Sequence, residues 1–459
     1  MVNKLRKTLP HVLPPALMDY LRRTMASTYR RGKEIKATPE LPEGPSILRN
    51  AWEHFNATSD LSKDVLGIPA SDRWNAYRER IRRNISSFPT AEAAILFGQS
   101  RVEFGNNTPA KDCVHLFDLH AQTLKSEFPH YSDVLDELGD SPYSNPVTLL
   151  QVKGRFLSQM YFVHIYYLLQ CLTWLPKLDL VCEIGGGYGG LARLWLLNPI
   201  HPPQTYVIID FPEALFFAEV FIRSNFPTTD VDYVTDSKPL DLNFAKKQRF
   251  ILCPIHHLQA LSGLPVDLVV NTGSLQEMSE EWVDFWMSWL RDQSCRYFYS
   301  MNYFAQPLGH LAESNNTWSP RLGAEWSTLM MRSNPAYFMQ HTTHNFAEII
   351  AEKTGIPAAV SKSELLTRYE RARQRVLDGQ GLLECMEIFR FGPGEDVAWD
   401  LTQRMVELRR IPKEAYYLSE LLRKNCSEAF RSRHGEALDK LYSQLRRIRA
   451  AGLENRICP

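Results

Sequence analysis

Glycines and an acidic residue follow two apolar segments near the middle of this 459-residue chain. The segment Val181–Gly190 reads Val-Cys-Glu-Ile-Gly-Gly-Gly-Tyr-Gly-Gly, and Thr205–Asp210 reads Thr-Tyr-Val-Ile-Ile-Asp. Glycines let the main chain approach a ligand without a Cβ in the way. An acid about twenty residues further on, after a second strand, can accept hydrogen bonds from both hydroxyls of a ribose. Strand, glycine loop, helix, strand and acid in this order indicate a site for an adenosine-containing cofactor.

The glycines fit two different cofactor patterns. Gly185, Gly187 and Gly190 satisfy the dinucleotide pattern G-x-G-x-x-G, whereas an acid and alternate glycines from Glu183 to Gly189 satisfy the methyltransferase pattern E-x-G-x-G-x-G. Glu183 favours the second pattern, because a buried carboxylate is costly unless it pairs with a polar group. A sulfonium cofactor with an amino group would supply that partner, directly or through water. Asp210 also fits the N-cap of a helix that begins at Pro212.

Further polar residues follow a later apolar segment. Val266–Met278 reads Val-Asp-Leu-Val-Val-Asn-Thr-Gly-Ser-Leu-Gln-Glu-Met, which predicts a strand that runs into a polar loop. Glu277 in this loop fits two roles equally well. One is helix capping ahead of Ser279, and the other is contact with a substrate or its reacting proton.

Four segments together carry a resemblance to a known family. Glu183–Gly190, Ile209–Leu215, Asn271–Met278 and Tyr299–Asn302 resemble the sugar O-methyltransferase family of class I, S-adenosylmethionine-dependent enzymes. The Ser-Leu-Gln-Glu-Met run is the most specific part, and the resemblance covers about residues 150 to 305. It implies a seven-stranded Rossmann-like α/β sheet, S-adenosylmethionine as the methyl donor, and a glycan or nucleotide-sugar hydroxyl as the acceptor.

The resemblance also assigns roles to single positions. Asp210 would bind the ribose, and Asp236 would contact the adenine amino group, although Asp236 fits an ordinary turn residue as well. Tyr188 would close over the site, and Asn271 and Thr272 would offer backbone carbonyls to the cofactor's amino group. The predicted cofactor-binding set is Glu183, Gly185, Gly186, Gly187, Tyr188, Gly189, Asp210, Phe211, Asp236, Asn271 and Thr272.

Methyl transfer to oxygen is an in-line displacement that needs a positioned general base, since a protonated sugar hydroxyl is a poor nucleophile. Glu277 is the first candidate and His310 the second, and Asn302 could orient the acceptor hydroxyl. The remaining candidates are four histidines, namely His256, His257, His341 and His344. No adjacent acidic pair follows the Val266 strand, so no metal is predicted.

Composition narrows the class of protein. Lys and Arg number 52, as do Asp and Glu, so no overall charge attracts nucleic acid, and none is predicted as a partner. Eight cysteines without a C-x-x-C pair favour a reducing compartment, which predicts a cytoplasmic protein. No secretory leader is expected at the N-terminus. The apolar stretch 156–175 contains Gln159, His164 and Gln170, which favours a buried helix over a membrane span.

The chain divides into three predicted regions. Residues 1–145 are mostly helical and begin with a basic arm (1–36), which could touch an anionic membrane surface or lie solvated or docked. Residues 146–345 alternate predicted strands (178–184, 205–210, 232–235, 266–271, 295–300) with helices (190–198, 212–226, 279–292). Residues 346–459 are predicted as helical, at 396–410, 413–424 and 430–450. This last region could form a cap or bind a protein partner or a second copy.

Two other functions fit parts of the pattern. A nicotinamide-dependent oxidoreductase could use the same glycine loop, although Glu183 is unusual there. A catalytically silent adaptor with a methyltransferase fold could use the helical ends to recruit partners, but the intact glycine loop and Asp210 argue against it.

Overall fold

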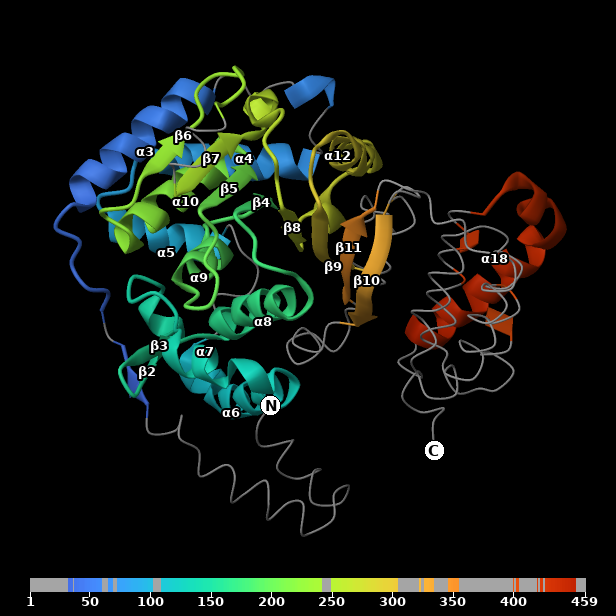
Figure 1. Ribbon diagram of the computed structural model, residues 1–459, viewed down its shortest axis with the longest axis horizontal. Coiled ribbons are helices and arrows are strands. Elements are labelled where there is room, and N and C mark those ends of the chain that lie inside the picture. Colours follow the sequence, from blue (N-terminus) through green and yellow to red (C-terminus); the bar gives the residue numbers. More distant parts are fainter. Residues whose placement is uncertain are drawn as a thin grey trace, which may run out of the picture.

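The computed structural model describes residues 32–35, 37–59, 65–68, 72–101, 109–241, 249–303, 326–333, 346–354 and 426–450, together with residues 322, 399, 402, 403, 419, 422 and 423 (Figure 1). At its centre is an eight-stranded sheet in the order β10-β11-β9-β8-β4-β5-β7-β6. In chain order the strands are β4 (Leu180–Ile184), β5 (Thr205–Asp210), β6 (Val231–Tyr233), β7 (Phe250–Pro254), β8 (Leu268–Thr272), β9 (Tyr297–Tyr303), β10 (Trp326–Ser333) and β11 (Phe346–Lys353).

Six neighbouring strands, from β9 to β6, are parallel, and β11 is antiparallel to both β9 and β10. The parallel strands are apolar runs because both faces of the sheet are covered. Val181 faces one core cluster and Cys182 the other, as the two-residue period of a strand requires. This arrangement confirms the predicted Rossmann-like α/β fold. The carboxyl ends of the parallel strands form one edge, where a ligand site is expected.

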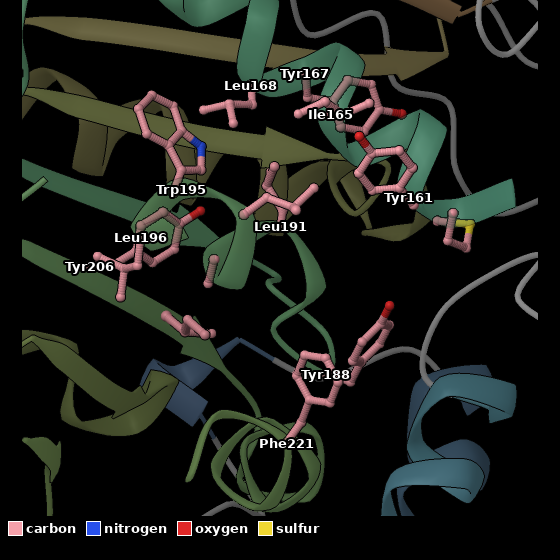
Figure 2. Packing of buried hydrophobic residues seen from close by; sticks show 14 of the residues in the cluster. Tyr161, Ile165, Tyr167, Leu168, Tyr188, Leu191, Trp195, Leu196, Tyr206 and Phe221 are labelled. Atoms are coloured by element: carbon pink, nitrogen blue, oxygen red, sulfur yellow. The ribbon is translucent and has the colours of Figure 1, made fainter. Parts of the chain in front are cut away.

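Helices cover each face of the sheet (Figure 1). One face carries α8 (Gln159–Trp174), α9 (Gly190–Leu197) and α10 (Pro212–Asn225), and the other carries α12 (Glu280–Asp292) and the 3₁₀ helix η7 (Ile255–Leu261). Ser158 caps α8 and Ser279 caps α12, each accepting a hydrogen bond from a backbone N–H of the first turn. Figure 2 shows side chains of α8 and α9, among them Leu168, Leu191 and Trp195, in one cluster with Tyr206 of β5.

The N-terminal helices belong to the same hydrophobic core as the sheet. They are α3 (Gly44–Ser59), α4 (Asp72–Ile85), α5 (Ala91–Arg101), α6 (Ala110–Glu127) and α7 (Ser132–Glu137). Phe216 and Phe217 of α10 pack against aromatic rings from this region, including Phe55 of α3 and Phe97 of α5. The predicted division at residue 145 therefore separates two sequence patterns but not two cores.

Short elements complete the described chain. A small antiparallel sheet joins β1 (Lys33–Glu34), β2 (Leu150–Val152) and β3 (Arg155–Leu157). Single 3₁₀ turns lie at η4 (Val65–Gly67), η5 (Pro129–Tyr131), η6 (Pro146–Thr148) and η8 (Leu275–Glu277), and the last helix is α18 (Glu428–Ala450).

Most predicted elements are confirmed, with shifts of a few residues at their ends. The apolar stretch at 156–175 is the buried helix α8, and 430–450 lies within α18. Three strands of the central sheet were missed, β7, β10 and β11, as were the three short strands of the small sheet. The predicted end of the α/β region at residue 345 is wrong, because β11 pairs with β9 along its length.

The predicted helices at 396–410 and 413–424 and the basic arm lie almost entirely outside the described residues. None of the described helices has the length and apolar character that a membrane span needs.

Candidate cofactor and acceptor site

The glycine loop follows β4 and is held on both sides. Gly185 donates its N–H to the Ile209 carbonyl at 2.8 Å, which ties the loop to β5. Gly185 has φ = 74°, and a Cβ there would lie 2.4 Å from the Ser274 Oγ, on the loop after β8. Gly189 has φ = 88° and is the N-cap of α9. The two glycines are therefore required by positive φ, and Gly185 also by a close approach of two loops.

Asp210 lies at the end of β5, directly beside this loop. Its carboxylate accepts hydrogen bonds from the Gly187 N–H at 3.0 Å and the Phe211 N–H at 2.7 Å. Burial raises the pKa of Asp210 to about 7; these two hydrogen bonds oppose the rise, and Glu213 adds to it. The side chain is only partly buried, so a ligand can reach it. The carboxylate therefore joins the glycine loop to β5 where a ribose ligand was predicted.

Glu183 has a partner within the protein, contrary to the reasoning that linked it to a cofactor. Its carboxylate accepts a hydrogen bond from the Tyr206 hydroxyl at 2.9 Å, and Glu183 is 2% exposed. Burial, together with the charge of Glu183, raises the pKa of Tyr206 well above its ordinary value, so this hydroxyl stays a donor. The pair satisfies the buried acid without any ligand. Glu183 thus does not by itself decide between the two cofactor patterns.

The loop after β8 is fixed by a network of side-chain amides. The Asn271 Nδ2 donates to the Ile184 carbonyl at 2.9 Å, and its Oδ1 accepts from the Leu275 N–H at 3.2 Å. Asn302 of β9 donates to the Asn271 Oδ1 at 2.9 Å and accepts from the Gln276 N–H at 3.2 Å. Both asparagines are fully buried. Asn302 was predicted to orient the acceptor, but its amide is bonded to the loop, so it acts as a positioning residue.

Helix α4 connects the loops that follow β5 and β8. The Trp74 Nε1 donates to the Glu277 carbonyl oxygen at 3.1 Å, and the Trp74 ring lies 5.8 Å from the Phe211 ring, centroid to centroid. Glu277 and Phe211 are partly buried, and so is Trp74. No local pattern predicts this contact, because Trp74 lies far from both loops along the chain. The N-terminal region therefore contributes a side chain to the carboxyl edge of the sheet.

Two arginines anchor α4 to the first turn of α10. The Arg78 Nε donates to the Glu213 carboxylate at 3.1 Å, and Arg82 forms a second hydrogen bond to the same carboxylate. The Arg78 guanidinium also lies 4.6 Å from the centroid of the Phe211 ring. Glu213 is 1% exposed, so its charge depends on these two partners. This ion pair holds α4 over Phe211.

Asp236 lies further from the glycine loop than predicted. Strand β7, which was not predicted, runs between β5 and β6, so Asp236 follows the outermost strand. Its carboxylate is exposed and accepts a hydrogen bond from the Lys238 N–H at 2.9 Å, as a turn residue does. The strand next to β5 is β7, and Asp210 pairs with its last residue, Pro254. Ile255 and His256 follow Pro254 and therefore lie closer to Asp210 along the sheet edge than Asp236 does.

Tyr188 does not close over the site. It is 2% exposed, and its ring packs against Phe221 of α10 at 4.9 Å between centroids (Figure 2). The glycines at 185, 186 and 187 and Thr272 remain partly exposed along the carboxyl edge, as a ligand-contacting surface requires.

The candidate histidines His310, His341 and His344 lie outside the described residues. Within the described ranges, no three His, Cys, Asp or Glu side chains come together in a way that could hold a metal ion.

Known proteins offer only distant comparisons. No family model matches the chain, and no curated protein matches its sequence. Among solved structures, an rRNA methylase from Escherichia coli is 12% identical, covers 73% of this chain and 98% of its own, and gives a TM-score of 0.29. Magnesium protoporphyrin IX methyltransferase from Synechocystis PCC 6803, with bound SAH, is 14% identical over 42% of this chain and 82% of its own, with a TM-score of 0.27.

A third match is phosphoethanolamine N-methyltransferase 2 from Haemonchus contortus, in complex with S-adenosyl-L-methionine. It is 13% identical over 41% of this chain and 52% of that one, with a TM-score of 0.27. At these scores the overlaps are partial, so the fold assignment rests on the strand order of the chain itself. The resemblance to the sugar O-methyltransferase family stays a prediction.

Proposed function

We propose that this protein is an S-adenosylmethionine-dependent O-methyltransferase that acts on a sugar hydroxyl of a glycan, surface polysaccharide or nucleotide-sugar precursor. The observation that carries the proposal is the grouping of three elements at one edge of the sheet. These are the glycine loop, the Asp210 carboxylate beside it, and the rigid polar loop bearing Glu277. The sugar acceptor is inferred from the sequence resemblance alone.

The residues present fit the cofactor. Asp210 keeps acceptor capacity for the two ribose hydroxyls, since a carboxylate offers about four acceptor sites and two backbone N–H groups bond to it. The glycine loop presents backbone to a ligand, since Gly185, Gly186 and Gly187 are partly exposed and carry no side chain. Asn271 and Thr272 end β8 beside that loop, as the prediction for the amino group of methionine requires.

The strand order favours this cofactor over a nicotinamide dinucleotide. A dinucleotide-binding fold has parallel strands in the order 3-2-1-4-5-6. This sheet departs from that order at both ends: β7 lies between β5 and β6, and β11, which is antiparallel, lies between β9 and β10. Because Glu183 is satisfied by Tyr206, the strand order is a stronger argument than Glu183 itself.

The proposed reaction needs one proton transfer by the protein. When bound, S-adenosylmethionine supplies an electrophilic methyl group. The Glu277 loop would hold the acceptor, and the Glu277 carboxylate would take the hydroxyl proton as that oxygen accepts the methyl group. S-adenosylhomocysteine and the methyl ether are the products. Asn302 and Asn271 keep the loop in place, and Trp74 donates a hydrogen bond to the Glu277 carbonyl.

Two histidines are poorly placed to act as the base. His256 and His257 follow β7, which is three strand positions from β8, or about 14 Å at the usual spacing of neighbouring strands. Glu277 therefore remains the first candidate among the described residues.

Calorimetric titration tests the cofactor directly. The protein is expected to bind S-adenosylmethionine and S-adenosylhomocysteine but not NAD. Binding of NAD alone would favour the oxidoreductase interpretation, and binding of none of the three would favour the adaptor.

Substitution of Glu277 tests the catalytic role. Glu277→Gln should lower the incorporation of radiolabelled methyl into a panel of nucleotide sugars and polysaccharides by on the order of a hundredfold, because it removes the base. Its affinity for S-adenosylhomocysteine should stay unchanged. Glu281→Gln, on the exposed first turn of α12, is the matched control and should keep full activity. Normal turnover of the Glu277 variant would transfer the role of base to another residue.

A further inference from the structure

Two histidines follow β7 and differ in their hydrogen bonding. The His257 Nδ1 lies 3.0 Å from the Ser237 Oγ, on the side of the outermost strand. Both ring nitrogens of His256 are buried, and neither has a hydrogen-bond partner among the described residues. The two rings lie 4.3 Å apart, centroid to centroid. A buried polar group without a partner costs free energy, so His256 calls for an explanation.

His256 lies where a base attached to the Asp210-bound ribose would be. In the sheet, β4 with the glycine loop, β5 with Asp210 and β7 are consecutive neighbours, and Asp210 pairs in register with Pro254. The base on C1′ and the 5′ substituent on C4′ leave a ribose at opposite ends of the ring, flanking the ring oxygen. If the 5′ substituent runs toward the glycine loop, the base runs toward β7. His256 begins about one strand spacing, or about 4.8 Å, to that side of Asp210.

The chemistry of His256 suits a purine. Burial, and then the charges of His257 and Arg78, lower the pKa of His256 to about 4, so the imidazole is neutral near pH 7. A neutral imidazole has one N–H donor and one bare nitrogen acceptor. Adenine likewise presents an amino donor and ring-nitrogen acceptors on one edge. The neutral ring also avoids placing a cation beside Arg78.

We propose that His256 is the hydrogen-bonding contact for the adenine base of the cofactor, and that its ring nitrogens gain a partner only when the base is bound. The inference rests on the proposed function only in requiring a cofactor that contains adenine. It replaces Asp236, whose carboxylate is exposed beyond the outermost strand. It also explains why the ligand-free protein keeps two buried ring nitrogens of His256 without a hydrogen-bond partner among the described residues, which costs free energy.

A pair of substitutions separates this role from packing. His256→Phe keeps a planar ring without nitrogens, and His256→Gln keeps one donor and one acceptor. Calorimetry should show that His256→Phe weakens S-adenosylhomocysteine binding about tenfold, the scale of one lost hydrogen bond, whereas His256→Gln stays within about threefold of the parent protein. The melting temperature of ligand-free His256→Phe should not fall, because the unpartnered nitrogens are gone.

Two controls accompany these variants. His257→Phe makes the same change in the neighbouring ring and loses the bond to Ser237, so it should lower the ligand-free melting temperature but leave affinity unchanged. Asp236→Asn should change neither quantity. Unchanged S-adenosylhomocysteine affinity in His256→Phe would overturn the inference while leaving the proposed function intact. If the parent protein bound no adenine nucleotide, the proposed function and the inference would both be lost.

A spectroscopic measurement covers the case in which His256→Phe does not fold. In the parent protein labelled with ¹⁵N-histidine, adding S-adenosylhomocysteine should shift the ring-nitrogen signal that is missing from the His256→Gln spectrum. An unshifted His256 signal at saturating ligand would overturn the inference, because a new hydrogen bond changes the shielding of the nitrogen.

Discussion

The carboxyl edge of the sheet has two halves, one at the ends of β8 and β9 and the other at the ends of β5 and β7. Both halves carry polar side chains, but these differ in their hydrogen-bond partners and in their exposure. On the β8 side, Asn271 and Asn302 are fully buried and bond to each other and to loop backbone. On the β5 side, Asp210 accepts two backbone hydrogen bonds and stays partly exposed, and the ring nitrogens of His256 have no hydrogen-bond partner among the described residues. One half of the edge is therefore complete without ligand, and the proposed cofactor would complete the other. The first half should govern stability and turnover, and the second half affinity.

Asn302→Ala should have the largest effect on the completed half. It would leave the Gln276 N–H and the Asn271 and Ser300 oxygens without their present partner in a buried place. We expect a loss of about 3 kcal/mol in the free energy of unfolding, measured with urea, and a fall in methyl transfer as the Glu277 loop loosens. Affinity for S-adenosylhomocysteine should change much less. A variant as stable as the parent would show that the network is not needed.

Asp210→Ala should give the opposite pattern. Calorimetry is expected to show weaker S-adenosylmethionine binding by about 1 to 3 kcal/mol, since charged hydrogen bonds to the ribose are lost. The free energy of unfolding should change by no more than about 1 kcal/mol, because water can replace the carboxylate at a partly exposed site. Unchanged affinity would remove Asp210 from the cofactor site.

The pH dependence of binding should follow the same carboxylate. Because the pKa of Asp210 is about 7 and the ribose hydroxyls favour its ionised form, affinity should fall about tenfold between about pH 8 and about pH 6. Asp210→Asn, which cannot titrate, should show a flat profile.

Asp210 should make the stability of the ligand-free protein fall as the pH rises, whereas it makes cofactor affinity increase. The folded-state pKa lies above the ordinary value of 3.8, so the ligand-free protein holds the proton more tightly when folded. That contribution to stability is present below about pH 4 and is lost as the pH rises through about 7. A parent and an Asp210→Asn protein with the same pH profile of unfolding would contradict it.

Trp74→Phe should have the smallest effect and tests the contact between the two halves. The change keeps an aromatic ring near Phe211 but removes the hydrogen bond to the Glu277 carbonyl. We expect methyl transfer to fall severalfold, equivalent to about 1 kcal/mol, with little change in cofactor affinity. Tyr77→Phe on the same helix serves as the control. A larger fall in cofactor affinity than in turnover would place Trp74 on the β5 side instead.

Local patterns in the sequence predicted the positions of the glycine loop after β4 and of Asp210 at the end of β5. The glycine loop and Asp210 are specified by residues close together in the chain, because glycine and a strand-ending acid are each required by the turn they occupy. The roles of Asn302 and Asp236 could not be predicted in the same way. Asn302 bonds to a loop from another strand, and the distance of Asp236 from the loop depends on β7 inserting between β5 and β6.

The missed strands have different physical causes. Phe250–Pro254 is a short apolar run without a period, which only its pairing with β5 defines as a strand. Strand β11 contains Glu348, a fully buried acid whose carboxylate accepts hydrogen bonds from the Tyr166 and Tyr299 hydroxyls. An acid in an apolar run argues against a buried strand, and its partners come from a helix and a strand far along the chain.

The two buried glutamates of α10 have a consequence for any attempt to shorten the protein. Glu213 is paired with Arg78 and Arg82 of α4, and Glu219 lies 2.9 Å from the His54 Nδ1 of α3. A truncated protein that began at α8 would keep the whole eight-stranded sheet but would expose a charged and aromatic surface that packs against other helices. The smallest cooperatively folding unit of this chain therefore begins well before the glycine loop does.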